Sequence, residues 1–516
     1  MKNIKKVLLS LSVGLFMVMA CSEENLEVTD ENRLNPDVFW QDGTQAKQAI
    51  IGAYSPLANQ FGWGRMMPIH TMYRSDATNP IAFQGVITDA SNFSIEPTFG
   101  RLSEIWGEFW KTILRANTIL VEVPAIEDSS FTDVDRNAIL GEAYFLRAYQ
   151  YFYLVTMFRN VPLITVPAAS LDEVKNAPAD PEQVWQQIIS DLQVAQSLLP
   201  QTWDSGNVGR ATWGAATGLL GKTYMYHSGI DNSNEYAQAA VEFKKIIDSG
   251  VYTLMSNYAD NFGDDQENNA ESLFEIQHDD NGFSWGADIA GGLRTAAWEP
   301  DLAPPGFTSQ SGMLINSWVK DAFLAETTTG GETDPRAFST IVYDYPGAML
   351  YETPFATGFA NDLSTVTVRK YLDFRPGKTQ ADFGFGGFPS VINWRIMRYA
   401  DILLLYAEAE NETNGGSGAA LDALNQVRTR SSMPVRVTSN QATLRQQIRD
   451  ERVLELMFEG DRYHDLLRWG MIPDAITDEL KSNLGGSQYV PGREYLPIPQ
   501  IEVDTNPLYN QNPGYN

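Results

Sequence analysis

Two stretches near the C-terminus decide the fold class: residues 394–411 read WRIMRYADILLLYAEAEN, and residues 449–469 read RDERVLELMFEGDRYHDLLRW. Apolar residues recur in both at the spacing of one helix face, so we expect helices over residues 394–413 and 443–458. Neither stretch resembles a catalytic motif. They therefore predict a helical scaffold.

The same periodicity predicts seven further helices, several of them in antiparallel pairs with short links. They cover residues 44–60, 102–121, 135–158, 181–199, 213–227, 234–249 and 418–431. The helices at 213–227 and 234–249 alternate small and aromatic residues, as tetratricopeptide hairpins do. The chain is therefore predicted to be mainly α.

Residues 251–390 differ in composition. They are rich in Gly, Pro, Asp, Asn and aromatic residues, and short strand-like pieces occur at 272–277 and 366–371. A long irregular stretch on a rigid scaffold is where binding residues tend to lie.

Composition excludes several classes of function. The chain has 516 residues, of which 43% are hydrophobic, and a formal net charge of −28. This charge argues against a nucleic-acid partner and against electrostatic docking on anionic lipid. The single cysteine, Cys21, excludes a disulfide framework and a zinc site built on several thiolates.

The N-terminus has the pattern of an export signal. Three lysines precede an apolar run at 7–20, which is too short to span a bilayer, and Cys21 follows Ala20 directly. This resembles a bacterial lipoprotein cleavage site. We expect residues 1–20 to be a signal peptide, Cys21 to be lipidated and residues 21–35 to form a flexible tether. The alternative is an ordinary secretory signal beside a chance cysteine.

Several motifs in order resemble one family. Residues 141–152 read GEAYFLRAYQYF, residues 271–277 read ESLFEIQ, and residues 495–502 read YLPIPQIE. Together with the two C-terminal stretches, they are similar to the SusD/RagB family of outer-membrane nutrient-binding lipoproteins. The resemblance covers nearly all of the mature chain.

The resemblance implies a mainly α, SusD-like fold: tetratricopeptide-like helical pairs form the scaffold, and a loop-rich half binds ligand. The body would span residues 36–516, with an N-terminal helical part at 36–250, the irregular region at 251–390 and the C-terminal signature region at 391–516. The family implies a lipid-anchored outer-membrane protein, facing the cell exterior, that captures oligosaccharide or polysaccharide for a SusC-like TonB-dependent transporter. It implies no catalysis and no cofactor.

Candidate ligand contacts are chosen by loop placement, because the family motifs mark the scaffold. Trp and Tyr rings stack on the C–H face of a sugar, and forked or planar polar groups bind its hydroxyls. The candidates are Trp63, Tyr73, Arg74, Asp76, Asn79, Phe83, Phe93, Trp285 and Trp298. For each, the alternative is a structural loop anchor or a partner contact.

Other functions stay open from the sequence. The cargo is alternatively a peptide or glycopeptide, or the protein is a lid with little affinity of its own. A surface glycoside hydrolase is a weaker alternative, since it needs paired carboxylates and 65 acidic residues make such pairs unavoidable. We expect the acids on apolar helices to form ion pairs instead. These acids are Glu142, Asp401 and Glu408, with Arg147, Arg395 and Arg398 as expected partners.

Metal and phosphate sites find little support. The four histidines have no ligand spacing, and the acidic stretch at 260–265 breaks the EF-hand pattern. The glycines at 384–387 lead into a proline rather than a helix. We expect neither a metal nor a cofactor.

Overall fold

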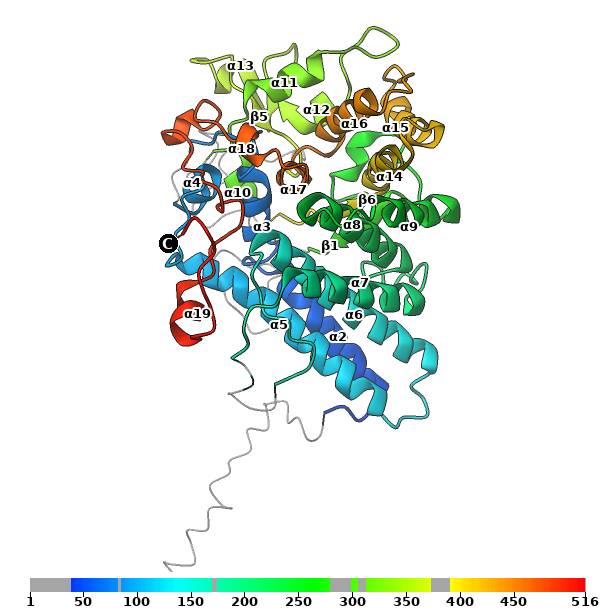
Figure 1. Ribbon diagram of the computed structural model, residues 1–516. Helices are drawn as coiled ribbons and strands as arrows, with labels where there is room; N and C mark the ends of the chain where they lie inside the picture. Colours follow the sequence, from blue (N-terminus) through cyan, green and yellow to red (C-terminus); the bar gives the residue numbers. More distant parts are fainter. Residues whose placement is uncertain are drawn as a thin grey trace, which may run out of the picture.

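Long helices dominate the first half of the chain and pack in sequence order (Figure 1). The computed structural model describes residues 39–81, 85–168, 173, 175–278, 298–304, 312–372 and 390–515. Its N-terminal helices are α2 (Gly43–Ala58), α3 (Met66–Pro68), η2 (Ile69–Tyr73), α4 (Gly85–Asn92), α5 (Gly100–Glu122), η3 (Val123–Ala125), α6 (Asp133–Met157), α7 (Pro181–Leu198), α8 (Trp213–Asp231) and α9 (Tyr236–Ser249).

The scaffold is a row of helices in which each packs on the next. Contacts run from α5 to α6, α7, α8 and α9, and then to α14 (Tyr399–Asn414), α15 (Gly418–Arg430) and α16 (Gln441–Leu456). In Figure 1 this row rises from α5 and α6 at the bottom to α15 and α16 at the top. The predicted mainly α fold with helical pairs is confirmed.

Capping residues explain where these helices begin. Asp42 accepts a hydrogen bond from the Gln45 amide at 2.9 Å, and Thr212 accepts one from the Ala215 amide at 3.1 Å. Each cap satisfies a backbone N–H that the first helical turn leaves without a partner. The α9 helix ends at Ser249 and is followed by Gly250, whose φ of +65° is the left-handed conformation that often closes a helix.

The predicted helix over residues 394–413 is wrong at its beginning. Residues Trp394–Arg398 form strand β6, which pairs antiparallel with β1 (Ser272–Ile276), and α14 starts only at Tyr399. A short apolar run fits either a buried strand or a helix, so periodicity alone does not separate the two. The β1 strand lies within the strand-like piece at 272–277, as predicted.

The middle of the chain holds short elements. They are η4 (Tyr258–Asn261), α10 (Glu299–Leu302), α11 (Ser317–Leu324), α12 (Ala337–Thr340), β2 (Ile341–Val342), β3 (Met349–Leu350), β4 (Thr353–Pro354), α13 (Phe355–Gly358) and β5 (Thr367–Val368). Strand β5 pairs with β2, and β3 pairs with β4, both antiparallel. The strand-like piece at 366–371 therefore contains a real, very short strand.

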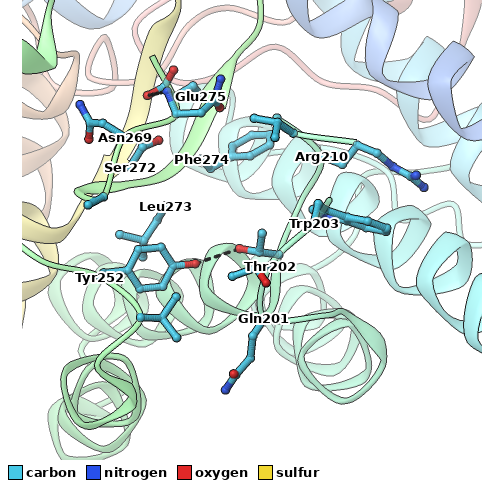
Figure 2. A pocket seen from close by; sticks show the side chains of 16 residues that line it. Gln201, Thr202, Trp203, Arg210, Tyr252, Asn269, Ser272, Leu273, Phe274 and Glu275 are labelled. Carbon is cyan, nitrogen blue, oxygen red and sulfur yellow. Dashed lines mark hydrogen bonds between the residues drawn. The ribbon is translucent and has the colours of Figure 1, made fainter. Parts of the chain in front are cut away.

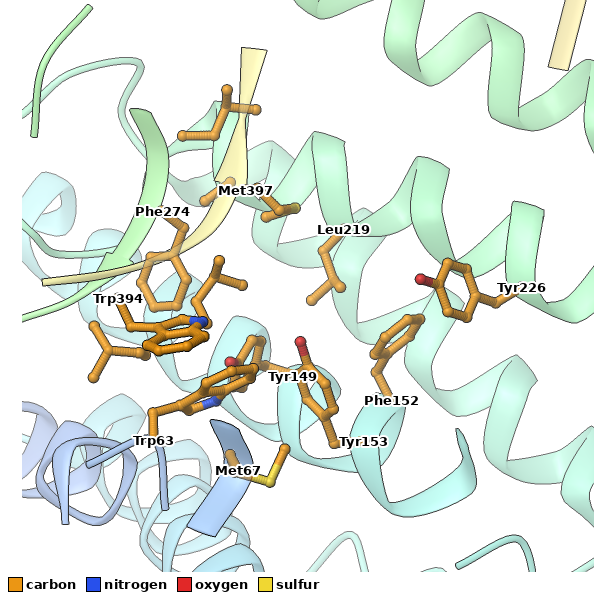
Figure 3. Close-up of a cluster of buried hydrophobic side chains, with 14 of the residues drawn as sticks. Trp63, Met67, Tyr149, Phe152, Tyr153, Leu219, Tyr226, Phe274, Trp394 and Met397 are labelled. Carbon is orange, nitrogen blue, oxygen red and sulfur yellow. The ribbon is translucent and has the colours of Figure 1, made fainter. Parts of the chain in front are cut away.

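Aromatic side chains fill the centre where these parts meet (Figure 3). The Trp63 ring lies 5.4 Å from Tyr153 of α6 and 5.8 Å from Trp394 of β6, centroid to centroid. Trp394 in turn stacks on Tyr371 at 4.3 Å. Buried aromatic contacts of this kind join the N-terminal helices, the middle region and the C-terminal region into one core.

The C-terminal segment returns to the N-terminal helices. It carries α17 (Asp461–Arg468), α18 (Ile472–Ala475), η6 (Ser482–Leu484) and α19 (Gln500–Thr505). The Leu496 amide donates to the Met157 carbonyl at 2.6 Å, and Asn512 Nδ2 donates to the Phe158 carbonyl at 2.7 Å. These two hydrogen bonds hold the last part of the chain against the C-terminal end of α6.

Candidate functional site

The C-terminal segment lies beside the predicted ligand loop. The predicted ligand residues Tyr73, Arg74, Asp76 and Asn79 fall at the end of η2 and in the turn after it. Three of them, Arg74, Asp76 and Asn79, form hydrogen bonds with residues of the C-terminal segment. The structure therefore brings together four of the predicted site residues and the end of the chain.

These four side chains are enclosed by protein. The Tyr73 hydroxyl donates to the Asp301 carbonyl, and Arg74 Nη2 donates to the Arg493 carbonyl at 2.6 Å. The Arg74 guanidinium also lies 4.5 Å from the Tyr463 ring centroid. Burial raises the pKa of Tyr73 well above its ordinary value. In this conformation Tyr73 and Arg74 contact protein, not solvent.

Asp76 and Asn79 are held in the same way. Asp76 accepts two hydrogen bonds from Arg462, and Asn79 Nδ2 donates to the Ser482 hydroxyl at 3.1 Å. Lys481 lies behind them, and its Nζ donates to the carbonyls of Ser75 at 2.6 Å and Thr78 at 2.9 Å. Burial lowers the pKa of Lys481 to about 7. The loop is thus fastened at several points by residues near the end of the chain.

Three predicted aromatic contacts lie in the interior. Trp63 and Phe93 are almost fully buried, and Trp298 is fully buried. The Trp298 ring packs edge-on against Trp394 at 5.0 Å, while Phe93 packs against Tyr489 at 5.5 Å. Packing accounts for all three positions in this conformation, and their contact with a ligand stays a prediction.

Three other predicted residues, Phe83, Trp285 and Cys21, lie outside the described residues. Ligand contact by Phe83 and Trp285, and lipidation of Cys21, stay predictions.

A pocket of about 210 Å³ opens elsewhere, between the 199–212 loop, the segment after α9 and strand β1 (Figure 2). Figure 2 shows Trp203 and Tyr252 on opposite sides of the view, with Leu273 beside Tyr252 and Phe274 higher up between the two sides. Residues with side-chain hydroxyls and amides also line it, among them Thr202, Ser272 and Asn269. The pocket therefore combines aromatic rings with uncharged hydrogen-bonding groups.

The Trp203 wall is fixed by a partly buried ion pair. The Arg210 guanidinium lies 4.1 Å from the Trp203 ring centroid, and Arg210 Nε donates to Glu142 Oε1 at 2.8 Å. The Trp203 Nε1 donates to the Ala211 carbonyl at 2.8 Å. Burial raises the pKa of Glu142, and the hydrogen bonds from Arg210 and Tyr54 oppose that rise. The loop thus holds its tryptophan in one orientation.

On the opposite wall, Tyr252 is held by a hydroxyl contact. Its Oη lies 3.1 Å from Thr212 Oγ1, and burial raises the pKa of its phenol. Asn268 and Gln277 form a reciprocal amide pair at 2.9 and 3.0 Å. These contacts set the shape of the pocket.

The sequence did not single out Trp203, Arg210 or Tyr252. Trp203 carries the same kind of signal as Trp285, because it lies in a polar loop with a nearby glycine at 206. The position of Tyr252 beside that loop depends on the packing of α8 on α9, which no local pattern reports.

Ion pairing by the acids on apolar helices is confirmed, but the expected partners are wrong. Glu142 pairs with Arg210, Asp401 pairs with Lys222 and Arg452, and Glu408 pairs with Arg468. The expected partners have acids of their own: Arg147 binds Asp191, Arg395 binds Glu275, and Arg398 binds Glu271, Glu455 and Glu459. Proximity in the fold, not spacing in the sequence, chooses each partner.

Within the described residues, no group of three or more His, Cys, Asp and Glu side chains is arranged to hold a metal ion. In the same part of the chain, no helix has both the length and the apolar character needed to cross a bilayer.

Family models match both halves of the chain. The model described as the SusD family matches residues 325–515, and the model described as starch-binding associating with outer membrane matches residues 33–225. The chain belongs to the SusD/RagB family. The family description thus links SusD-like proteins to starch binding and to the outer membrane.

Individual SusD-like proteins match over nearly the whole chain. SusD-like protein P25 of Formosa agariphila is 25% identical, over 96% of each chain. A SusD superfamily structure from Bacteroides vulgatus has a TM-score of 0.77 and 27% identity, covering 92% of this chain and 100% of that one. A structure described as a laminarin-binding SusD-like protein has a TM-score of 0.71 and 28% identity, covering 92% and 99%. The SusD-like fold therefore spans both helical and loop-rich parts.

Proposed function

We propose that this protein is a surface lipoprotein that binds oligosaccharides or polysaccharides and delivers them to a SusC-like TonB-dependent transporter, without catalysing a reaction. The observation that carries the proposal is the family match at both ends of the chain, whose N-terminal model is described as starch-binding and associated with the outer membrane. The similarity to a laminarin-binding SusD-like protein supports the same ligand class.

The burial and ion pairing of the acidic residues on the scaffold helices favour a binding protein over a glycoside hydrolase. A glycoside hydrolase requires two carboxyl groups that flank the scissile bond, roughly 5–10 Å apart. The helix acids Glu142, Asp401 and Glu408 are buried and bound by cations, so they are not available to a substrate.

Anchoring through Cys21 would hold the body beside the transporter. A flexible tether at residues 22–35 raises the local concentration of captured glycan at the pore, because the second binding step becomes intramolecular. Substituting Cys21→Ser tests the anchor: we expect the protein to move from the membrane fraction to the soluble fraction. A Cys21→Ser protein that stays in the membrane fraction would contradict lipidation.

The ligand class is tested by isothermal titration of the mature protein against plant, fungal and host glycans. We expect saturable binding to one glycan class, which Trp285→Ala abolishes while the circular dichroism spectrum is unchanged. Phe338→Ala is the matched control, since Phe338 is an exposed aromatic residue of the 251–390 region. Heat with peptides alone would move the cargo to the peptide class. If neither glycans nor peptides gave heat, the protein would be a lid without ligand affinity of its own.

The transporter partner is tested separately. We expect affinity-tagged protein, extracted in mild detergent, to co-purify with a TonB-dependent outer-membrane transporter. Recovery of the tagged protein without any such transporter would contradict the delivery step and leave glycan binding standing.

A further inference from the structure

The pocket between Trp203 and Tyr252 has the size of a small-ligand site. Its volume of about 210 Å³ is below the roughly 300 Å³ at which pockets for drug-sized ligands begin. Four residues at its lining are exposed to solvent, namely Gln201, Thr202, Val208 and Ala270. A ligand can therefore enter from solvent, but the space suits one sugar ring rather than a chain.

Its lining chemistry fits a pyranose. Trp203 and Tyr252 offer aromatic surface for the C–H face of a sugar, and both rings are half-buried, so part of each is accessible. The hydroxyls of Thr202 and Ser272 supply donors and acceptors for sugar hydroxyls, whereas the Asn269 amide is already bonded to Gln266, Asn261 and Glu271. Apolar walls with a few directed polar groups are typical of small-molecule sites.

The charges favour a neutral sugar over an acidic one. Among the described residues that line the pocket, Arg210 is the only cation and Glu275 the only acid. Arg210 binds Glu142 through Nε and Asn207 through Nη1, at 2.8 and 2.6 Å. The one cation of this lining is thus engaged by protein groups, and the net charge of the chain is −28.

Two glycines let the walls approach closely. A Cβ on Gly214 would lie 2.2 Å from Tyr252 Oη, and a Cβ on Gly209, at φ +91°, would lie 2.5 Å from Gln277 Cδ. Only glycine avoids these overlaps. Together with the Arg210–Glu142 pair, they form the pocket before any ligand arrives, which lowers the entropic cost of binding.

From this geometry we infer that the pocket binds a single neutral pyranose, as a terminal residue or side branch of the captured glycan. The ligand class in this inference, a glycan, rests on the proposed function. The new element is the place of the site, at the loop that connects α7 to α8. A single ring makes few contacts, so the expected Kd is on the order of 1–10 mM.

Ligand-detected NMR on the mature protein tests the site. The probes are methyl glycosides of glucose, galactose and mannose, with a methyl glucuronide as the charged comparison. We expect Thr202→Trp to fill the mouth and weaken binding at least tenfold. The matched control is Ser205→Trp, because Ser205 is exposed in the same loop and does not line the pocket. Tyr252→Phe keeps the ring but loses the hydroxyl that contacts Thr212, so the ring is less fixed and binding should weaken about three- to tenfold.

Two results would overturn the inference. One is the absence of any signal from neutral methyl glycosides at about 50 mM, far above the expected Kd. The other is equal binding by Thr202→Trp and Ser205→Trp. Polysaccharide binding is measured on the same samples. If a polysaccharide binds but no methyl glycoside does, the pocket assignment alone fails. If methyl glycosides bind in the pocket but no polysaccharide does, the proposed capture of glycan chains fails instead.

Discussion

Arg462 donates two hydrogen bonds to Asp76, from Nε to Oδ1 at 2.9 Å and from Nη2 to Oδ2 at 2.6 Å. The side chains are 15% and 9% exposed, so water screens the pair only weakly. The two residues are 386 positions apart in the sequence. The pair therefore joins α17 to the loop after η2. It also occupies the carboxylate of Asp76, which the sequence analysis predicts to bind sugar hydroxyls.

Removing Asp76 should destabilise the fold. We expect Asp76→Ala to lower the free energy of unfolding by about 2–3 kcal/mol, because Arg462 then lacks its acid in an enclosed site. Guanidinium unfolding measures the change, and Asp321→Ala is the control, since Asp321 is an exposed aspartate on α11. Unchanged stability with lost glycan affinity would instead assign Asp76 to the ligand.

The pair of Arg147 and Asp191 should couple strongly. Arg147 Nε and Nη2 each donate to Asp191 at 2.7 Å, and both side chains are almost fully buried. We expect Arg147→Met to cost about 3–5 kcal/mol, because it leaves Asp191 buried without a cation. The double variant Arg147→Met/Asp191→Leu should recover much of that loss. Additive effects of the two substitutions would show that the residues do not act as a pair.

Trp63 should act through stability. Its indole is 3% exposed and packs between Tyr153 and Trp394. We expect Trp63→Ala to cost about 3–5 kcal/mol, whereas the exposed Phe338→Ala should cost under about 1 kcal/mol. Thermal unfolding measures both. Glycan affinity, taken well below both melting temperatures, should be the same in the two variants. If Trp63→Ala lost glycan affinity but kept the stability of the parent, Trp63 would be a ligand contact, as the sequence predicts.

Two buried histidines should make the fold sensitive to acid. Burial lowers the pKa of His70 to about 3 and that of His464 to about 4, against about 6.5 in the unfolded chain. Between these values the unfolded state binds more protons, so stability is present above pH 6.5 and is lost as pH falls. Between pH 6.5 and 5 we expect a loss of roughly 1.5 kcal/mol for each histidine.

The histidine effect is checked by denaturant unfolding at several pH values. His70→Leu cannot take up the proton, so its stability should fall by roughly 1.5 kcal/mol less than that of the parent between pH 6.5 and 5. An unchanged dependence in His70→Leu would show that other groups cause the acid sensitivity.

Local patterns predicted the helices well and the contacts poorly. Helix periodicity and caps such as Thr212 are encoded within a few residues, so α8 and its neighbours were found close to their observed bounds. The β6 strand was missed because its state depends on pairing with β1, more than 100 residues earlier. The site was harder still. Loop position suggested Tyr73, but its burial depends on Asp301, which approaches only in the folded chain.

The fastening of the 73–79 loop has a consequence for biosynthesis. Arg462 and Lys481, which bind this loop, are made long after it. At about 5–20 residues per second, the 386 residues between Asp76 and Arg462 take roughly 20–80 s to translate. Throughout that interval the nascent chain lacks the cations that its loop will bind. A product cut short near residue 460 would therefore keep most of its helices but expose an unfinished loop, which makes it a natural target for chaperones and proteases.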